Sequence, residues 1–187
     1  MNKSMHLSEH YTLGEVCKTS HKTADGNIPS HVAIENLRRI CEEWLEDLRY
    51  SNNVLYEDKA LRQAQGPQEA DQALLGQAKR QSRARQAQGP VKGEQPIIIT
   101  SGYRSAEVNK LAGGSPTSNH LTGCAVDIRC VGVEQALRYA NILLDIADGT
   151  KRDYDELLIE RNKNGRYWIH FAVRPKENRR KTAFIQT

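Results

Sequence analysis

The sequence has little that would place it in a membrane. Its 187 residues contain no apolar run that approaches the roughly 18 residues of a membrane-spanning helix, and the mean hydropathy is −0.69. The first ten residues have no apolar core of the kind a signal peptide needs. We therefore expect a protein without a transmembrane segment that is cytoplasmic as synthesised.

Cysteine is also scarce, which argues against a disulfide scaffold or a cysteine-rich zinc fold. No Cys-x-x-Cys pair occurs. If residues 124–130 form one strand, the cysteines at its ends lie about 20 Å apart, far beyond disulfide reach. We expect buried, reduced thiols at all four cysteines, which are Cys17, Cys41, Cys124 and Cys130.

Aromatic residues make up only 6% of the chain, and one segment dilutes them further. Residues 51–95 hold nine glutamines and one aromatic residue, and the hexapeptide RQAQGP occurs twice in them. Two copies without an apolar ladder cannot stack into a solenoid core. We predict a solvated, mobile, low-complexity insertion with a short helix near Gln68–Gln86. A partner-binding arm is the functional alternative.

Positive charge is concentrated at one end of the chain. The net charge is +4, and five basic residues against Glu177 give the same +4 within residues 174–187. We predict a basic C-terminal tail there, outside a single domain of residues 1–173, serving solubility or loose attraction to an anionic surface. Nucleic-acid binding ranks last because no aromatic interleaving or known motif accompanies the charge.

The remaining sequence predicts an α+β fold with a small, mostly antiparallel sheet and flanking helices. Apolar positions at helical spacing follow Ser30 and end near Ser51, and a second helical pattern covers residues 133–148. Ser105 is placed to cap a short helix. Asn164-Gly165 predicts a hairpin turn. We expect strands at residues 96–100, 124–130, 156–160 and 167–173.

Two histidines and one aspartate stand out against this background. His120 lies in a loop, and Asp127 lies seven residues later on the polar face of a predicted strand. His170 lies within a run of aromatic and aliphatic residues, where an imidazole needs a partner. Two imidazole nitrogens and one carboxylate oxygen leave a fourth position for water, as in catalytic zinc sites.

These residues occur in a longer ordered set. Ser101-Gly102-Tyr103-Arg104-Ser105 precedes Ser118 and His120, and Trp168 accompanies His170. The set resembles the zinc D-alanyl-D-alanine carboxypeptidase family, and most closely its compact peptidase domains in prophage and bacterial proteins. Residues 7–50 and 96–173 carry the resemblance, which implies the fold of Hedgehog and DD-peptidase domains.

The resemblance implies roles for these residues. His120, Asp127 and His170 would bind Zn²⁺, Arg104 would bind substrate near the scissile carbonyl, and Ser118 would contact substrate. It implies hydrolysis of peptidoglycan stem peptides by a metal-activated water, as a D-Ala-D-Ala carboxypeptidase or an endopeptidase. We expect a monomer that would reach the cell wall after lysis or non-Sec export.

The general base departs from the family pattern. Many members carry Asp or Glu three residues before the last histidine, and this chain has Tyr167 there. A phenol is a poor base at neutral pH. If Asn162 pairs with Arg166 in the hairpin, Glu160 lies on the same face as His170, and we predict it as the base. The alternative is a catalytically silent peptidoglycan-binding module that keeps the fold.

Overall fold

The computed structural model describes residues 2–65 and 95–187. Contacts divide the chain into two compact units, Met1–Leu48 with Ile97–Thr187, and Arg49–Pro96. Every residue predicted to act in a site lies in the first unit. None of the helices in the described ranges is long and apolar enough to cross a membrane.

The first unit is built on a five-stranded mixed sheet with the order β1-β2-β4-β3-β5. All neighbouring pairs are antiparallel except β3 with β5, which is parallel. The fold is therefore α+β, as predicted, and its sheet is mostly antiparallel. Its strands are β1 (Ile99–Ser101), β2 (Ala125–Cys130), β3 (Glu156–Arg161), β4 (Tyr167–Ala172) and β5 (Lys181–Gln186).

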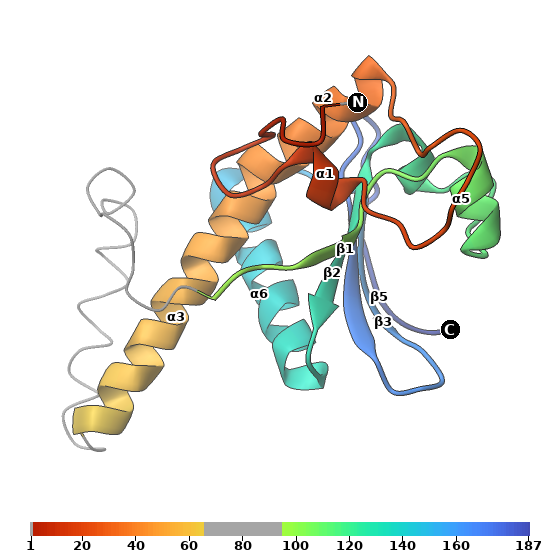
Figure 1. The fold of residues 1–187 in the computed structure, drawn as a ribbon. Coiled ribbons are helices and arrows are strands. Elements are labelled where there is room, and N and C mark those ends of the chain that lie inside the picture. Colours follow the sequence, from red (N-terminus) through yellow and green to blue (C-terminus); the bar gives the residue numbers. More distant parts are fainter. Residues whose placement is uncertain (1, 66–94) are drawn as a thin grey trace. The chain divides into compact units, whose positions relative to one another are not determined.

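One face of the sheet packs on the hydrophobic core. The helix α6 (Val133–Thr150) contacts β2, β3 and β4 on this face, and Figure 1 shows it lying along the sheet. The Trp44 ring meets Phe171 of β4 at a centroid distance of 5.0 Å. The short helix α5 (Ala106–Leu111) lies on the other side of the sheet, and Ser105 caps it as predicted.

The first long helix is longer than the sequence indicated. It begins with α2 (His31–Ile40), capped by Ser30, passes through a π-helical turn η1 (Cys41–Leu45) and continues as α3 (Glu46–Gln65). The predicted end near Ser51 is wrong, because serine and asparagine cost a helix less than about 1 kcal/mol each. No Gly or Pro occurs between Ser30 and Gln65, and Gly66-Pro67 comes next in the sequence.

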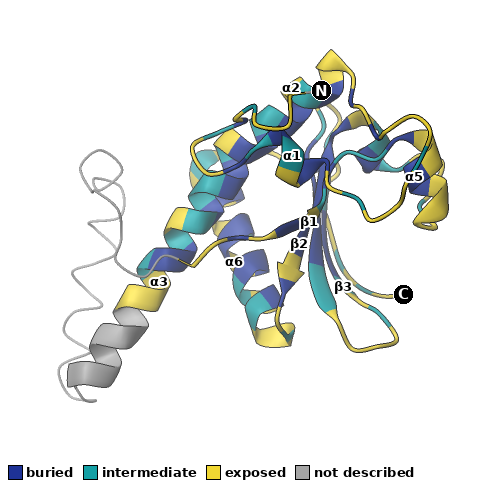
Figure 2. Cartoon of the chain, viewed as in Figure 1, coloured by how far each residue is buried: buried dark blue, intermediate teal, exposed yellow. Residues whose placement is uncertain are grey.

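The C-terminal residues are part of the sheet. Residues 174–187 were predicted to form a tail outside the domain, whereas Lys181–Gln186 form β5 and pair with β3 along its whole length. The predicted helix near Gln68–Gln86 lies outside the described residues. All four cysteines are buried and unpaired, as expected (Figure 2 shows the burial of the chain).

Candidate active site

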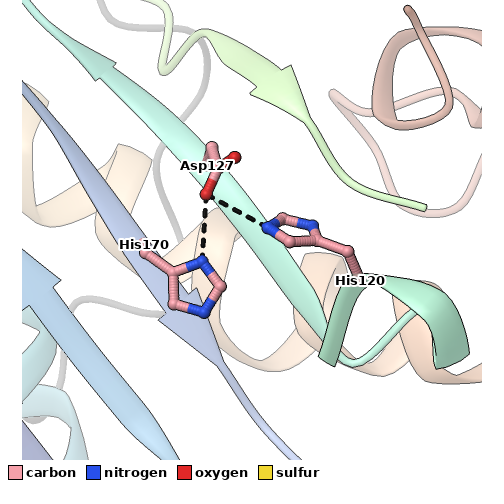
Figure 3. Close-up of side chains that lie close together, drawn as sticks. All are labelled: His120, Asp127 and His170. Atoms are coloured by element: carbon pink, nitrogen blue, oxygen red, sulfur yellow. Dashed lines mark hydrogen bonds and ion pairs between the residues drawn. The ribbon is translucent and has the colours of Figure 1, made fainter. Parts of the chain in front are cut away.

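The two histidines and the aspartate meet at the face of the sheet opposite α6 (Figure 3). Asp127 lies on β2, and its register partner on β4 is His170. His120 lies on the short 3-10 helix η3 (Asn119–Thr122), which Ser118 caps by accepting a hydrogen bond from the His120 backbone. A turn and two paired strands thus bring together residues that are distant in sequence.

The three side chains form one compact cluster. Oδ1 of Asp127 lies 3.2 Å from Nε2 of His120 and 3.0 Å from Nδ1 of His170. One potential ligand atom from each residue lies within 4.8 Å of the others. The side chains are only 2%, 10% and 11% exposed for His120, Asp127 and His170, so the cluster is nearly closed to solvent.

The backbone orients His120. Its Nδ1 lies 2.6 Å from the carbonyl oxygen of Gly102 and donates a proton to it, which leaves Nε2 facing Asp127. A side chain at Gly102 would place Cβ 2.3 Å from the carbonyl oxygen of Val16. Glycine is therefore required where this strand end approaches the N-terminal segment.

A left-handed glycine ends η3. Gly123 has φ +71, and a Cβ there would lie 2.4 Å from the carbonyl oxygen of Ala33 in α2. Only glycine adopts this conformation without strain. The turn that presents His120 therefore lies directly against the backbone of α2.

The Glu156 carboxylate lies on the far side of the His170 ring. Its Oε2 is 3.6 Å from Nε2 of His170, while Nδ1 faces Asp127. Arg179 and Lys181 form ion pairs with Glu156 at 3.1 and 3.2 Å. The contacts with His170 and Lys181 outweigh the effect of burial and lower the pKa of Glu156 to about 2.

Arg104 contacts the cluster through Asp127. Its Nη2 donates to Oδ2 of Asp127, and its Nε donates to Oγ of Ser101 at 2.7 Å. Burial alone would raise the pKa of Asp127, but His120 and His170 hold it well below the usual carboxyl range. Arg104, predicted to contact substrate, thus also fixes the orientation of the Asp127 carboxylate.

Glu160 lies on the same face as His170. It pairs with Trp168 on β4. The Asn162 N–H donates to the Arg166 carbonyl, and the Asn162 carbonyl accepts from the Gly165 N–H, as the predicted hairpin requires. Burial raises the pKa of Glu160, and the neighbouring charge of His170 and a hydrogen bond with Trp168 partly offset this. A carboxyl group with a raised pKa beside such a cluster is typical of a proton-transfer group.

Tyr167 lies on the other face of the sheet. It pairs with Cys130 and Arg161, packs against the core, and is one strand position out of phase with Trp168. In this regular pairing an acidic residue at position 167 would point away from His120 and Asp127. Leu158 on β3 is the register partner of His170. Glu160 lies two residues further along β3 and therefore on the same face of the hairpin.

Sequence reasoning missed a second buried ionic group next to the site. Asp155 is fully buried and receives hydrogen bonds from Arg179 at 2.7 Å and from Asn119 at 2.8 Å, with Arg174 at 3.0 Å. These contacts outweigh burial and lower the pKa of Asp155. Because Asn119 directly precedes His120, this group fixes the loop that carries the histidine. The sequence carried no local signal for this group, because Arg174 and Arg179 lie in the segment that was predicted to be a tail.

The cluster has the donor set that zinc prefers. Two imidazole nitrogens and one carboxylate oxygen converge on one point, and both histidines have a fixed partner for the other ring nitrogen. Hydrogen bonds with Asp127 and Glu156 outweigh burial and raise the pKa of His170 to about 9. The site therefore attracts positive charge, which a divalent cation would supply.

This buried His-Asp-His cluster could hold a metal ion, and the donor set is the one found in catalytic zinc sites. A model of the peptidase M15 family matches residues 59–154, just over half of the chain, and the chain belongs to that family. Membership implies a hydrolytic metallopeptidase, and family members are typically zinc-dependent. A comparison with curated proteins gave no match.

The matched range bears on two predictions. It contains His120 and Asp127 and ends before Glu160 and His170, so the hairpin residues rest on the geometry of the sheet. It also includes residues 59–95, which lie in the segment that we predicted to be an insertion.

Proposed function

We propose that the protein is a zinc-dependent peptidase that hydrolyses peptidoglycan stem peptides, as a D-Ala-D-Ala carboxypeptidase or an endopeptidase. One observation carries the proposal: the buried cluster of His120, Asp127 and His170 shares its sheet face with Glu160, whose pKa is raised by burial. Membership of the peptidase M15 family supports the class of reaction and the class of substrate.

In the proposed mechanism His120, Asp127 and His170 would hold the metal. Zinc bound there would act as a Lewis acid and lower the pKa of a coordinated water. Glu160 accepts the proton of the attacking water and transfers it to the leaving amine. A carboxylate with a raised pKa suits both steps, because it exchanges a proton near neutral pH more readily than an ordinary glutamate.

Arg104 and Ser118 are the two remaining predicted residues, and in this proposal they bind the substrate and orient the proposed metal ligands. Arg104 fixes Oδ2 of Asp127 and offers its other N–H groups to a substrate carbonyl or carboxylate. Its side chain is 18% exposed, so part of it faces solvent. Ser118 caps η3 and thereby positions His120, and we propose that its hydroxyl also contacts substrate.

The domain organisation follows the same proposal. The site and the helices α5 and α6, which lie on the two sides of the sheet, belong to one catalytic domain. Residues 51–95 interrupt this domain. The C-terminal strand β5 belongs to this domain, since it pairs with the strand that carries Glu160.

Peptidoglycan fragments treated with the zinc-loaded protein, with and without a chelator, would test the proposal by mass spectrometry. The expected result is loss of one defined peptide bond that the chelator prevents. Binding of fragments without cleavage at any protein concentration would instead favour the silent binding module. The position of Tyr167 on the opposite face weakens that alternative, since its support was the absence of an acid at this position.

A further inference from the structure

A groove lies beside the metal cluster on the same sheet. Arg129 and Trp168 are register partners on β2 and β4, two residues beyond Asp127 and His170 on the same face. The groove lies where β2 ends and β4 begins, and the hairpin turn and Thr100 of β1 also line it. Its polar, charged and aromatic lining residues are Thr100, Arg129, Asn162, Arg166, Tyr167 and Trp168.

The groove is positively charged. Arg129 and Arg166 are both exposed, and no acidic residue lines the groove. Among residues 2–65 and 95–187, no carboxylate lies within 4.0 Å of either guanidinium. The arginines nearer the cluster are different, because Arg104 and Arg179 are bound to Asp127 and Asp155.

The lining suits a carboxylate on a peptide. A guanidinium offers parallel N–H donors that match a carboxylate, and it stays charged at every physiological pH. Thr100 and Asn162 add polar side chains for the backbone of a ligand, and the half-buried Trp168 offers an apolar surface for its side chains.

The spacing relates this groove to the proposed reaction. Two residues along a strand span about 7 Å, so Arg129 and Trp168 lie about two residues of extended peptide from the metal ligands. A substrate with its scissile carbonyl at the cluster can therefore extend one or two residues into the groove. The sheet face thus continues from the reacting bond to Arg129, which has no carboxylate partner in the part of the chain that the structure describes.

We propose that this groove binds a carboxylate of the substrate, carried about two residues from the scissile bond, through Arg129 and Arg166. The inference rests on the proposed peptidase function and deepens it: the preferred substrate is an acidic peptide. Hydrolysis depends on the metal cluster and Glu160, whereas the preference for a negative charge depends on the groove.

Two matched substrates test the proposal. Stem pentapeptides that end in D-Ala-D-Ala carry either isoglutamate or isoglutamine at their second residue, which changes one carboxylate to a carboxamide. For the zinc-loaded wild type we expect kcat/KM to be about fivefold higher for the acidic peptide, the upper end for an exposed ion pair. Arg129→Gln and Arg166→Gln should each bring this ratio toward one.

Lys163→Gln is the matched control, because Lys163 is an exposed cation of the same hairpin that does not line the groove. Its ratio should equal that of the wild type. Equal rates of the wild type on both peptides, or an equal loss of the ratio in Lys163→Gln, would overturn the proposal.

The inference can fail separately from the proposed function. If the wild type cleaves neither peptide, titration calorimetry of both peptides with the zinc-loaded protein measures the same preference as a ratio of Kd values. Tighter binding of the acidic peptide that depends on Arg129 supports the groove even then. Equal Kd values overturn it.

Discussion

Glu156 and Asp127 hold His170 from opposite sides of its ring. Oε2 of Glu156 lies 3.6 Å from Nε2, and Oδ1 of Asp127 lies 3.0 Å from Nδ1. A carboxylate behind a metal-binding histidine fixes the tautomer and raises the basicity of the ligand nitrogen. Glu156 is in turn held by Lys181 from β5.

This relationship predicts that Glu156→Gln weakens zinc binding. The variant keeps the shape of the side chain and loses the charge behind His170, so we expect the affinity to fall about tenfold. Competition with a chromophoric chelator would measure it. Glu134→Gln is the control, because Glu134 is 81% exposed in the first turn of α6. An unchanged affinity in Glu156→Gln would show that the carboxylate does not act on His170.

His120→Ala should remove a ligand and reduce bound zinc well below one ion per chain. The buried Nε2 of His120 faces Asp127 and has no substitute at that position among the described residues. Metal analysis after dialysis would measure the stoichiometry. His31→Ala removes an exposed histidine at the start of α2 and should retain about one zinc.

Glu160→Gln should separate binding from chemistry. The variant cannot accept a proton, so we expect hydrolysis to fall by about 10²- to 10⁴-fold while zinc binding is retained. Initial rates on the cleaved fragment, together with metal analysis, would measure both. A full hydrolytic rate in Glu160→Gln would assign the base to another residue.

Asp155 predicts a pH-dependent contribution to stability. Its pKa is lower in the folded protein than in the unfolded chain, so it stabilises the fold above its ordinary pKa of about 3.8, and this contribution is lost as the pH falls below that value. Asp155→Asn should therefore lower the free energy of unfolding by about 2 kcal/mol at pH 7. Urea unfolding at pH 7 and pH 3 would show the difference shrinking at the lower pH.

Gly123→Ala should be much more destabilising than Gly113→Ala. Both glycines have φ +71, but a Cβ at Gly113 meets nothing within 4 Å, whereas one at Gly123 overlaps the Ala33 carbonyl. The strain alone costs about 1 kcal/mol, and the overlap adds to it by displacing the η3 turn from α2. Thermal unfolding of the two variants would separate the two effects. Equal Tm values would contradict this account.

The sequence predicted the register of the hairpin better than it predicted the edges of the fold. The turn at Asn164-Gly165 determines the hairpin register, so the sequence predicted Glu160 opposite Trp168, and the strand pairing confirms it. β5 escaped prediction because its basic, largely exposed residues look like a solvated tail, and its partner β3 is distant in sequence. The contacts of Asp155 escaped for the same reason, since Asn119 and Arg179 join it only in the folded sheet.

The separation in sequence of the three proposed metal ligands has a thermodynamic consequence. His120, Asp127 and His170 come from a turn and two strands, so the unfolded chain offers no assembled site. A metal that binds only the native state stabilises it by mass action, by about 2.7 kcal/mol at a free concentration 100 times its Kd. Metal supply would then set the fraction of folded protein as well as the fraction of active protein.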